Sequence, residues 1–261
     1  RGNMGQSGGE ATNVAMSIAR TGIFGDVFGR GSGATAHFTP SMQAFAGLVY
    51  RLFGIGSPVS ETILVAASVG LTLGGAWIWY RIAEQLEVPA AARLLGLAAI
   101  SLLPLNFAME VIEFRTWEGA LAVALAGLAL LQIIKLDQAE TSPRLSHLLL
   151  VAALCALTFF VNPAIGLAAY AAFGLLLLRN VPARRWPVTL ALAALFMIVV
   201  VTPWAARNYQ VFDRFIPLRS NFGLELALAN YPGALSSENP HKAFRARLAD
   251  IHPQETEKAF R

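Results

Sequence analysis

Long apolar runs separated by short polar breaks fill the middle of the chain, from residue 59 to residue 201. A helix that crosses the hydrocarbon core of a bilayer needs about 20 apolar residues, and most of these runs approach that length. Residues 148–178 would extend about 46 Å as one straight helix. Asn162 and Pro163 interrupt this run, so we expect a hairpin of two short helices there. The predicted spans are therefore 59–80, 90–108, 119–134, the two halves of 148–178, and 187–201.

Two shorter helices are predicted ahead of the first span. Residues 10–21 carry Val14 and Ile18 at helical spacing among alanines and end at Gly22, which indicates a short amphipathic helix. Residues 23–40 are rich in glycine, serine and threonine and should form a loop. Residues 41–53 are apolar but too short to span, so we expect a helix lying at the membrane interface. Tyr50 and Arg51 should then reach the lipid headgroups.

Composition agrees with a protein that spans a membrane. Of the 261 residues, 56% are hydrophobic and 14% are charged, whereas soluble domains carry about 25% charged residues. The expected fold is an all-α, polytopic transmembrane helix bundle with short juxtamembrane helices. We divide the chain into a first loop region at 1–57, a bundle of about six spans at 58–203, and a segment after the last span at 204–261. Because the chain begins at Arg1 rather than Met and ends at Arg261 in helix-like sequence, we expect it to be a fragment, with a membrane span upstream and a further region, either more spans or a soluble domain, downstream.

Lysine and arginine are distributed unevenly between the two ends of the predicted spans. Cytoplasmic loops of membrane proteins carry an excess of these residues. At its short loops one end has only Arg115, and the other end has Arg81, Arg93, Lys135, Arg144, Arg179, Arg184 and Arg185. The second end is therefore predicted to be cytoplasmic. With six spans, residues 1–57 and 204–261 then both lie on the outer face.

Acidic, basic and amide side chains gather in the segments assigned to the outer face. A carboxylate there can take the proton from an attacking hydroxyl group, and arginines can hold a phosphate through paired hydrogen bonds. The candidates are Glu10, Asp26, His37, Glu110, Glu113, Glu118, Asn162, Arg207, Asn208, Arg214, Arg219, Asn221 and Glu225.

Simple structural roles remain open for these residues. Glu10 and Glu118 could be acids that favour the start of a helix, and the arginines could be anchors that reach the headgroups. Asp26 fits a turn, and His37 fits a hydrogen-bonded loop residue. The sequence has no phosphate-binding loop, nucleophile elbow or His/Cys metal spacing. The single cysteine, Cys155, lies in an apolar run, and no basic cluster with stacking aromatics suggests nucleic acid.

Residues 202–234, TPWAARNYQVFDRFIPLRSNFGLELALANYPGA, resemble a signature of bacterial glycosyltransferases related to the family 39 protein mannosyltransferases. These are membrane enzymes of the GT-C type. Residues 9–54 are similar to the family's first outer loop, in which an acid heads a helix and a glycine-rich turn follows. The pair Trp117–Glu118 and the bend VNPA at 161–164 also resemble family features. The resemblance thus covers most of the chain from Gly9 to Ala234.

The resemblance implies an inverting transfer of a sugar from a polyprenyl-phosphate donor to a protein, glycan or lipid acceptor. The reaction would take place at the outer face of a bacterial inner membrane, with Glu10 as the general base and Glu118 as a second catalytic residue. Substrate-binding roles are implied for His37, Asn162, Arg207, Asn208, Arg219 and Asn221. No cofactor is expected. Common members have Asp-Glu where this chain has Gly9–Glu10, so a metal site is not expected either.

Two other functions remain open. A lipid or solute transporter, or a flippase, would also place polar residues among apolar spans, but it predicts repeated halves and ionisable groups near span midpoints. The charges of this chain cluster at the span ends instead. A non-catalytic membrane scaffold predicts that substitution of Glu10 has no effect.

Overall fold

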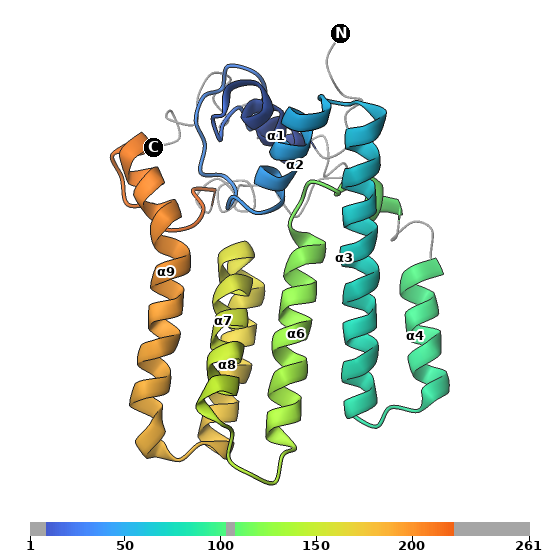
Figure 1. Cartoon of the computed structure of the whole chain (residues 1–261), viewed down its shortest axis with the longest axis vertical. Helices are drawn as coiled ribbons and strands as arrows, with labels where there is room; N and C mark the ends of the chain where they lie inside the picture. The colour runs from blue at the N-terminus through green and yellow to red at the C-terminus, as the bar shows by residue number, and fades with distance from the viewer. Residues whose placement is uncertain (1–8, 103–107, 222–261) are drawn as a thin grey trace, which may run out of the picture. The chain divides into compact units, whose positions relative to one another are not determined.

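The computed structural model describes residues 9–102 and 108–221, and this part of the chain is all-α, as predicted. Of the described residues, 75% are helical. Among the described residues, four helical segments are long and apolar enough to cross a membrane. They are α3 (Pro58–Gln85), α6 (Gly119–Asp137), α8 (Pro163–Asn180), and the segment Ala183–Phe212, most of which is α9 (Trp186–Phe212) (Figure 1). The protein is therefore an integral membrane protein.

Two further apolar helices are shorter. Helix α4 (Ala90–Leu102) has 13 residues and α7 (Leu145–Val161) has 17, so α7 reaches only the lower limit of about 17–25 residues for a span. Residues 103–107 of the span predicted at 90–108 lie outside the described residues. After them comes a short π-helix, η1 (Met109–Glu113), in the connection to α6. Of the six predicted spans, four thus have full length in the structure.

The predicted hairpin at 148–178 is confirmed. Helices α7 and α8 pack against each other, and the chain turns between them at Asn162, which has an extended backbone (φ −142°, ψ 105°). Asn162 Oδ1 accepts a hydrogen bond from the backbone N–H of Ile165 at 3.2 Å, and Pro163 occupies the first turn of α8. Proline suits this position because the first-turn N–H groups have no partner within the helix. Asn162 and Pro163 therefore end one helix and begin the next.

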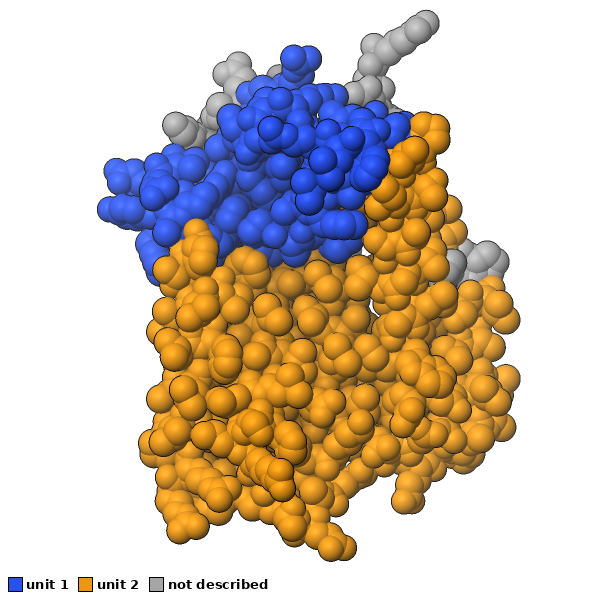
Figure 2. All heavy atoms as spheres, in the orientation of Figure 1, with its two compact units in different colours: residues 1–57, 204–261 blue, residues 58–203 orange. Residues whose placement is uncertain are grey.

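The chain divides into two compact units, which Figure 2 shows in different colours. One unit is Pro58–Pro203, and the other combines the residues up to Ser57 with those from Trp204 onward. In the first unit, which we call the bundle, α6, α7 and α8 enclose a core that includes Leu148, Cys155 and Phe173. Gly166 of α8 lies so close to α7 that an added Cβ would come within 2.2 Å of the Phe159 Cα. Small residues of this kind let membrane helices approach closely.

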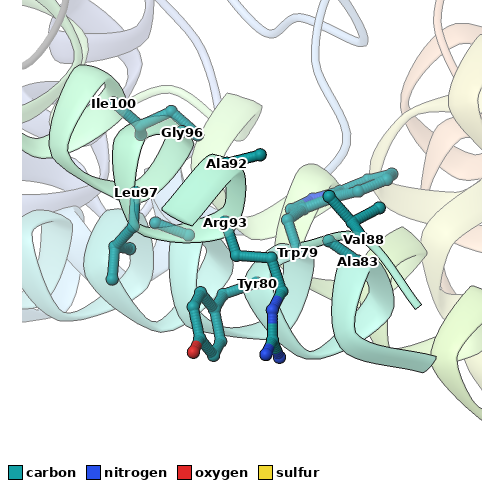
Figure 3. A pocket seen from close by; sticks show the side chains of 10 residues that line it. Trp79, Tyr80, Ala83, Val88, Ala92, Arg93, Gly96, Leu97 and Ile100 are labelled. Atoms are coloured by element: carbon teal, nitrogen blue, oxygen red, sulfur yellow. The ribbon is translucent and has the colours of Figure 1, made fainter. Parts of the chain in front are cut away.

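Helices α3 and α4 meet at a corner of the bundle that is stabilised by Arg93 (Figure 3). The Arg93 guanidinium lies over the Tyr80 ring, 4.9 Å from its centroid, and forms an ion pair with Glu84 at 2.7 Å. Arg81 pairs with the same carboxylate at 2.7 Å. Glu84 therefore balances the cations at this loop.

The second unit, which we call the loop unit, is built on α1 (Gly9–Thr21) and α2 (Met42–Phe53). The two helices pack against each other, and an added Cβ at Gly47 would meet the Ile18 side chain at 2.7 Å. The last turns of α9, beyond Pro203, also belong to this unit. The sequence placed Tyr50 at the headgroups, but its side chain is buried, with 3% of its surface exposed. The apolar side chains that α2 does expose are Phe45, Leu48, Leu52 and Phe53.

Candidate functional site

Glu10 and His37 come together in the loop unit. Glu10 lies in the first turn of α1, and its Oε2 is 3.3 Å from His37 Nε2. The His37 side chain is 5% exposed, whereas that of Glu10 is 39% exposed. For this contact to be a hydrogen bond with a neutral imidazole, Nε2 must carry the proton. The pair thus consists of an accessible carboxylate oriented by a buried imidazole.

The rings of Phe28 and Phe38 fix the position of His37. Their centroids lie 5.6 Å and 4.9 Å from that of the imidazole, both in edge-to-face geometry. The backbone N–H of His37 also donates to Thr35 Oγ1 at 3.0 Å. A histidine held in this way cannot turn away from Glu10 without breaking the aromatic packing.

The loop that carries His37 is folded by Asp26. Asp26 has a φ of 59°, and its Oδ1 accepts hydrogen bonds from the backbone N–H groups of Gly31 at 3.0 Å and Gly33 at 3.2 Å. Asn13 of α1 donates from Nδ2 to the Val27 carbonyl at 3.1 Å. The prediction that Asp26 is a turn residue is therefore confirmed. The turn connects the loop to α1, the helix that carries Glu10.

Arg207 holds the same loop from the other side. Its Nη2 donates to the Phe24 carbonyl at 2.8 Å and its Nη1 to the Thr35 carbonyl at 2.7 Å. The guanidinium also lies 4.9 Å from the centroid of the Trp204 ring. The resemblance implies that Arg207 binds phosphate. These contacts favour a different role, in which Arg207 holds the loop in place.

Asn208 has a structural place as well. It is fully buried, accepts a hydrogen bond from Arg207 Nη1 at 2.9 Å, and donates from Nδ2 to the Ile216 carbonyl at 2.9 Å. It therefore fixes the turn that follows α9. This turn lets the next residues return toward the loop.

The residues that follow this turn come back to the loop and bring Arg219 close to His37. The Ser220 N–H donates to the Ala36 carbonyl at 2.9 Å, and the Trp204 indole donates to the Leu218 carbonyl at 2.7 Å. Arg219 Cζ then lies 6.0 Å from the centroid of Phe38, the ring that also packs on His37. An acid, an imidazole and a guanidinium are thus linked through one phenylalanine. Asn221, the last described residue of this segment, is half-buried, and Glu225 and Asn230 of the family-like stretch lie outside the described residues.

The other two predicted site residues belong to the bundle. Glu118 is 4% exposed and directly precedes α6, but its side chain makes no capping hydrogen bond. Asn162 is the cap of α8 described above. The structure therefore brings together Glu10, His37, Arg207, Asn208 and Arg219 in the loop unit, and places Glu118 and Asn162 in the bundle.

Sequence reasoning missed a buried ion pair in the bundle. Arg115 Nη2 lies 2.7 Å from Glu61 Oε2, and the Arg115 side chain is buried. In the sequence, Arg115 stands out only as the single basic residue in the short loops at its end of the predicted spans. The available signal was that Arg115 is the one basic residue in the polar stretch 110–118, where a buried arginine would need an anionic partner.

Glu110 occupies a further polar position, beside an apolar cavity of about 240 Å³ lined by Thr72, Trp79 and Val123. Burial raises the pKa of the Glu110 carboxyl, and a hydrogen bond from the Ala120 backbone partly offsets the rise. The sequence had placed Glu110 among the outer-face acids, and the structure assigns it a contact at the start of α6. Within the described ranges, no group of three histidine, cysteine or acidic side chains could hold a metal ion.

No family model matches the sequence, and neither a curated protein nor a solved structure matches it.

Proposed function

We propose that this membrane protein is a glycosyltransferase that moves a sugar from a polyprenyl-phosphate donor to a hydroxyl group of an acceptor. The observation that carries the proposal is the Glu10–His37 pair, an accessible carboxylate held by a buried imidazole. The resemblance of residues 202–234 to the signature of membrane glycosyltransferases supports it. An apolar helix bundle also suits a donor with an isoprenoid tail.

The reaction is a single displacement at the anomeric carbon of the sugar. Glu10 takes the proton of the acceptor hydroxyl while the hydroxyl oxygen forms a bond to that carbon. The bond between the carbon and the phosphate oxygen breaks, and polyprenyl phosphate leaves with the electron pair. Because the attack comes from the side opposite the leaving group, the anomeric configuration inverts. His37 keeps the Glu10 carboxylate oriented throughout.

Arg219 is the residue that we assign to the donor phosphate. It lies beside Phe38 and therefore close in the structure to His37, the partner of Glu10. A guanidinium can form paired hydrogen bonds to phosphate and offset the charge that the leaving group gains. The Arg207 guanidinium already donates hydrogen bonds to two backbone carbonyls. We therefore assign Arg207 to holding the loop and not to binding the phosphate.

Substitution of Arg219 tests this assignment. With full-length protein in lipid nanodiscs and a labelled polyprenyl-phosphate sugar, Arg219→Ala should raise the donor KM by roughly tenfold to a hundredfold, the loss of about one charged hydrogen bond. Lysine should restore only part of the affinity, because it cannot make the paired contact. Arg30→Ala, which removes an exposed arginine of the same unit, is the matched control. An unchanged donor KM in Arg219→Ala would contradict the assignment.

The same assay separates the enzyme from a transporter. A transferase releases polyprenyl phosphate in proportion to the sugar that is transferred. A flippase or transporter moves the labelled donor across a vesicle membrane and leaves the bond between sugar and phosphate intact. Movement of the donor without release of polyprenyl phosphate would overturn the proposed function.

The proposal requires the loop unit to face outward, and cysteine labelling tests this orientation. Arg30 and Asp213 are exposed residues of the loop unit, and Ser142 is an exposed residue of the loop between α6 and α7. Cysteines at positions 30 and 213 should react with an impermeant thiol reagent added to intact cells, and a cysteine at 142 should not. The native Cys155 is buried, so its background should be low. Labelling at 30 with protection at 213 would mean an odd number of crossings.

A further inference from the structure

Three arginines line one cavity of the bundle. Arg144 directly precedes α7, and Arg184 and Arg185 lie in η2 (Ala183–Arg185), directly ahead of α9. The cavity has a volume of about 470 Å³, and its lining is completed by Ser142, Leu145, Leu148 and Val188. Figure 1 shows that α7 and α9 begin at the same end of the bundle. Two segments about 40 residues apart thus bring their cations to one place.

Hydrogen bonds hold the two segments beside the cavity. Arg185 Nη1 donates to the Pro143 carbonyl at 3.3 Å and connects the segment before α9 to the one before α7. The Trp186 indole donates to the Val181 carbonyl at 2.9 Å and fixes the turn between α8 and α9. Ser142 Oγ donates to the Asn180 carbonyl at 3.3 Å. The arginines therefore sit on an ordered frame.

The charge of this cluster is not balanced by the protein. No acidic residue lines the cavity, and within the described residues none of the three arginines forms an ion pair. Of the acids at the neighbouring loops, Asp137 pairs with Arg179 and Glu84 with Arg81 and Arg93. Glu140, two residues before Ser142, is exposed and forms no ion pair with any of the three arginines in the described part of the chain. Neither α7 nor α9 has an acid in its first turn. The positive ends of two helix dipoles therefore add to the three guanidinium groups.

The apolar part of the cavity indicates what kind of anion fits. Leu145, Leu148 and Val188 belong to the first turns of two apolar helices, and Val188 is 54% exposed. A ligand in this cavity would meet cations at one side and the aliphatic flank of the bundle at the other. Inorganic phosphate could contact only the cations. A membrane phospholipid could contact both surfaces.

We propose that this cavity binds the headgroup of an anionic phospholipid from the surrounding leaflet. The three arginines hold the phosphate and a further headgroup anion or hydroxyl, and an acyl chain lies along Leu145 and Val188. Basic pockets between membrane helices bind anionic headgroups in this manner. The site is independent of the sugar transfer proposed above, because its residues lie in the bundle and take no part in the loop unit.

Lipid binding to the wild type and to arginine variants tests the site. Purified full-length protein is titrated with phosphatidylglycerol or phosphatidylcholine, and bound lipid is counted by native mass spectrometry. The wild type should prefer phosphatidylglycerol by at least tenfold. Replacing Arg144, Arg184 and Arg185 together by Ala should abolish the preference. Replacing Arg20 and Arg30, two exposed arginines of the loop unit, removes positive charge elsewhere in the protein and should leave the preference unchanged.

Arginines near span ends also set the orientation of a membrane protein, so a second variant keeps the charge. Replacing the three arginines by Lys should preserve insertion, measured by cysteine labelling at position 142, and should still weaken the preference several-fold because the paired contacts are lost. A preference that survives the Ala variant, or that falls equally in the loop-unit control, would overturn the site. Displacement of the lipid by millimolar inorganic phosphate would overturn the lipid assignment in favour of a simple anion site.

Discussion

Replacing Glu10 by Gln should lower the turnover of sugar transfer by about 10²–10⁴, the range typical for the loss of a general base. An acceptor hydroxyl is a weak nucleophile, and Gln cannot take its proton. The substitution keeps the size of the side chain, and the amide oxygen can still accept a hydrogen bond from His37 Nε2. The loop unit should therefore fold as before. Turnover is measured as the release of polyprenyl phosphate at saturating donor.

Two controls make this result specific. Glu140→Gln changes an exposed acid between α6 and α7 in the same way and should leave turnover unchanged. Glu118→Gln changes a buried acid of the bundle and should cost less than Glu10→Gln if that residue only orients the acceptor. Donor binding by Glu10→Gln should match the wild type. Near-normal turnover in Glu10→Gln, at equal membrane levels, would remove the central residue of the proposed function and favour a transporter or a scaffold.

Most helices could be predicted because length and apolar content alone decide whether a segment can cross a bilayer. The continuation of α9 to Phe212 was missed. The last span was predicted to end at residue 201, but the helix runs through Pro203 to Phe212. A proline is tolerated in a membrane helix when other groups satisfy the carbonyl it leaves unpaired.

The site was only partly predictable. Glu10 and His37 were both named, yet their pairing depends on a loop turned by Asp26 and on ring packing by Phe28 and Phe38. Side-chain patterns also say nothing about backbone carbonyls as partners. Arg207 therefore suggested a phosphate ligand from its residue type, whereas the structure pairs it with the carbonyls of Phe24 and Thr35.

Arg207→Ala should accordingly damage the loop unit more than it damages donor binding. It removes two hydrogen bonds from a charged donor, each worth about 1.5–3 kcal/mol, and leaves the Phe24 and Thr35 carbonyls to find other partners. It also removes the contact with the Trp204 ring. Because these carbonyls lie in the loop that carries His37, the orientation of Glu10 should be lost as well. We expect a lower temperature of unfolding, faster proteolysis within residues 22–40, and a fall in kcat that exceeds the change in donor KM.

Comparison with two other substitutions decides between the roles of Arg207. Arg207→Lys should rescue little, since one ammonium group cannot reproduce the forked contact to two carbonyls. Arg30→Ala, in the same loop, removes a charge without a loop-holding contact and should leave both proteolysis and kcat unchanged. If Arg207→Ala instead keeps the wild-type unfolding temperature and proteolysis pattern while the donor KM rises tenfold or more, Arg207 contacts the donor phosphate as the family resemblance implies. The loop would then be held by its own turn at Asp26, and Arg207 would join Arg219 at the phosphate.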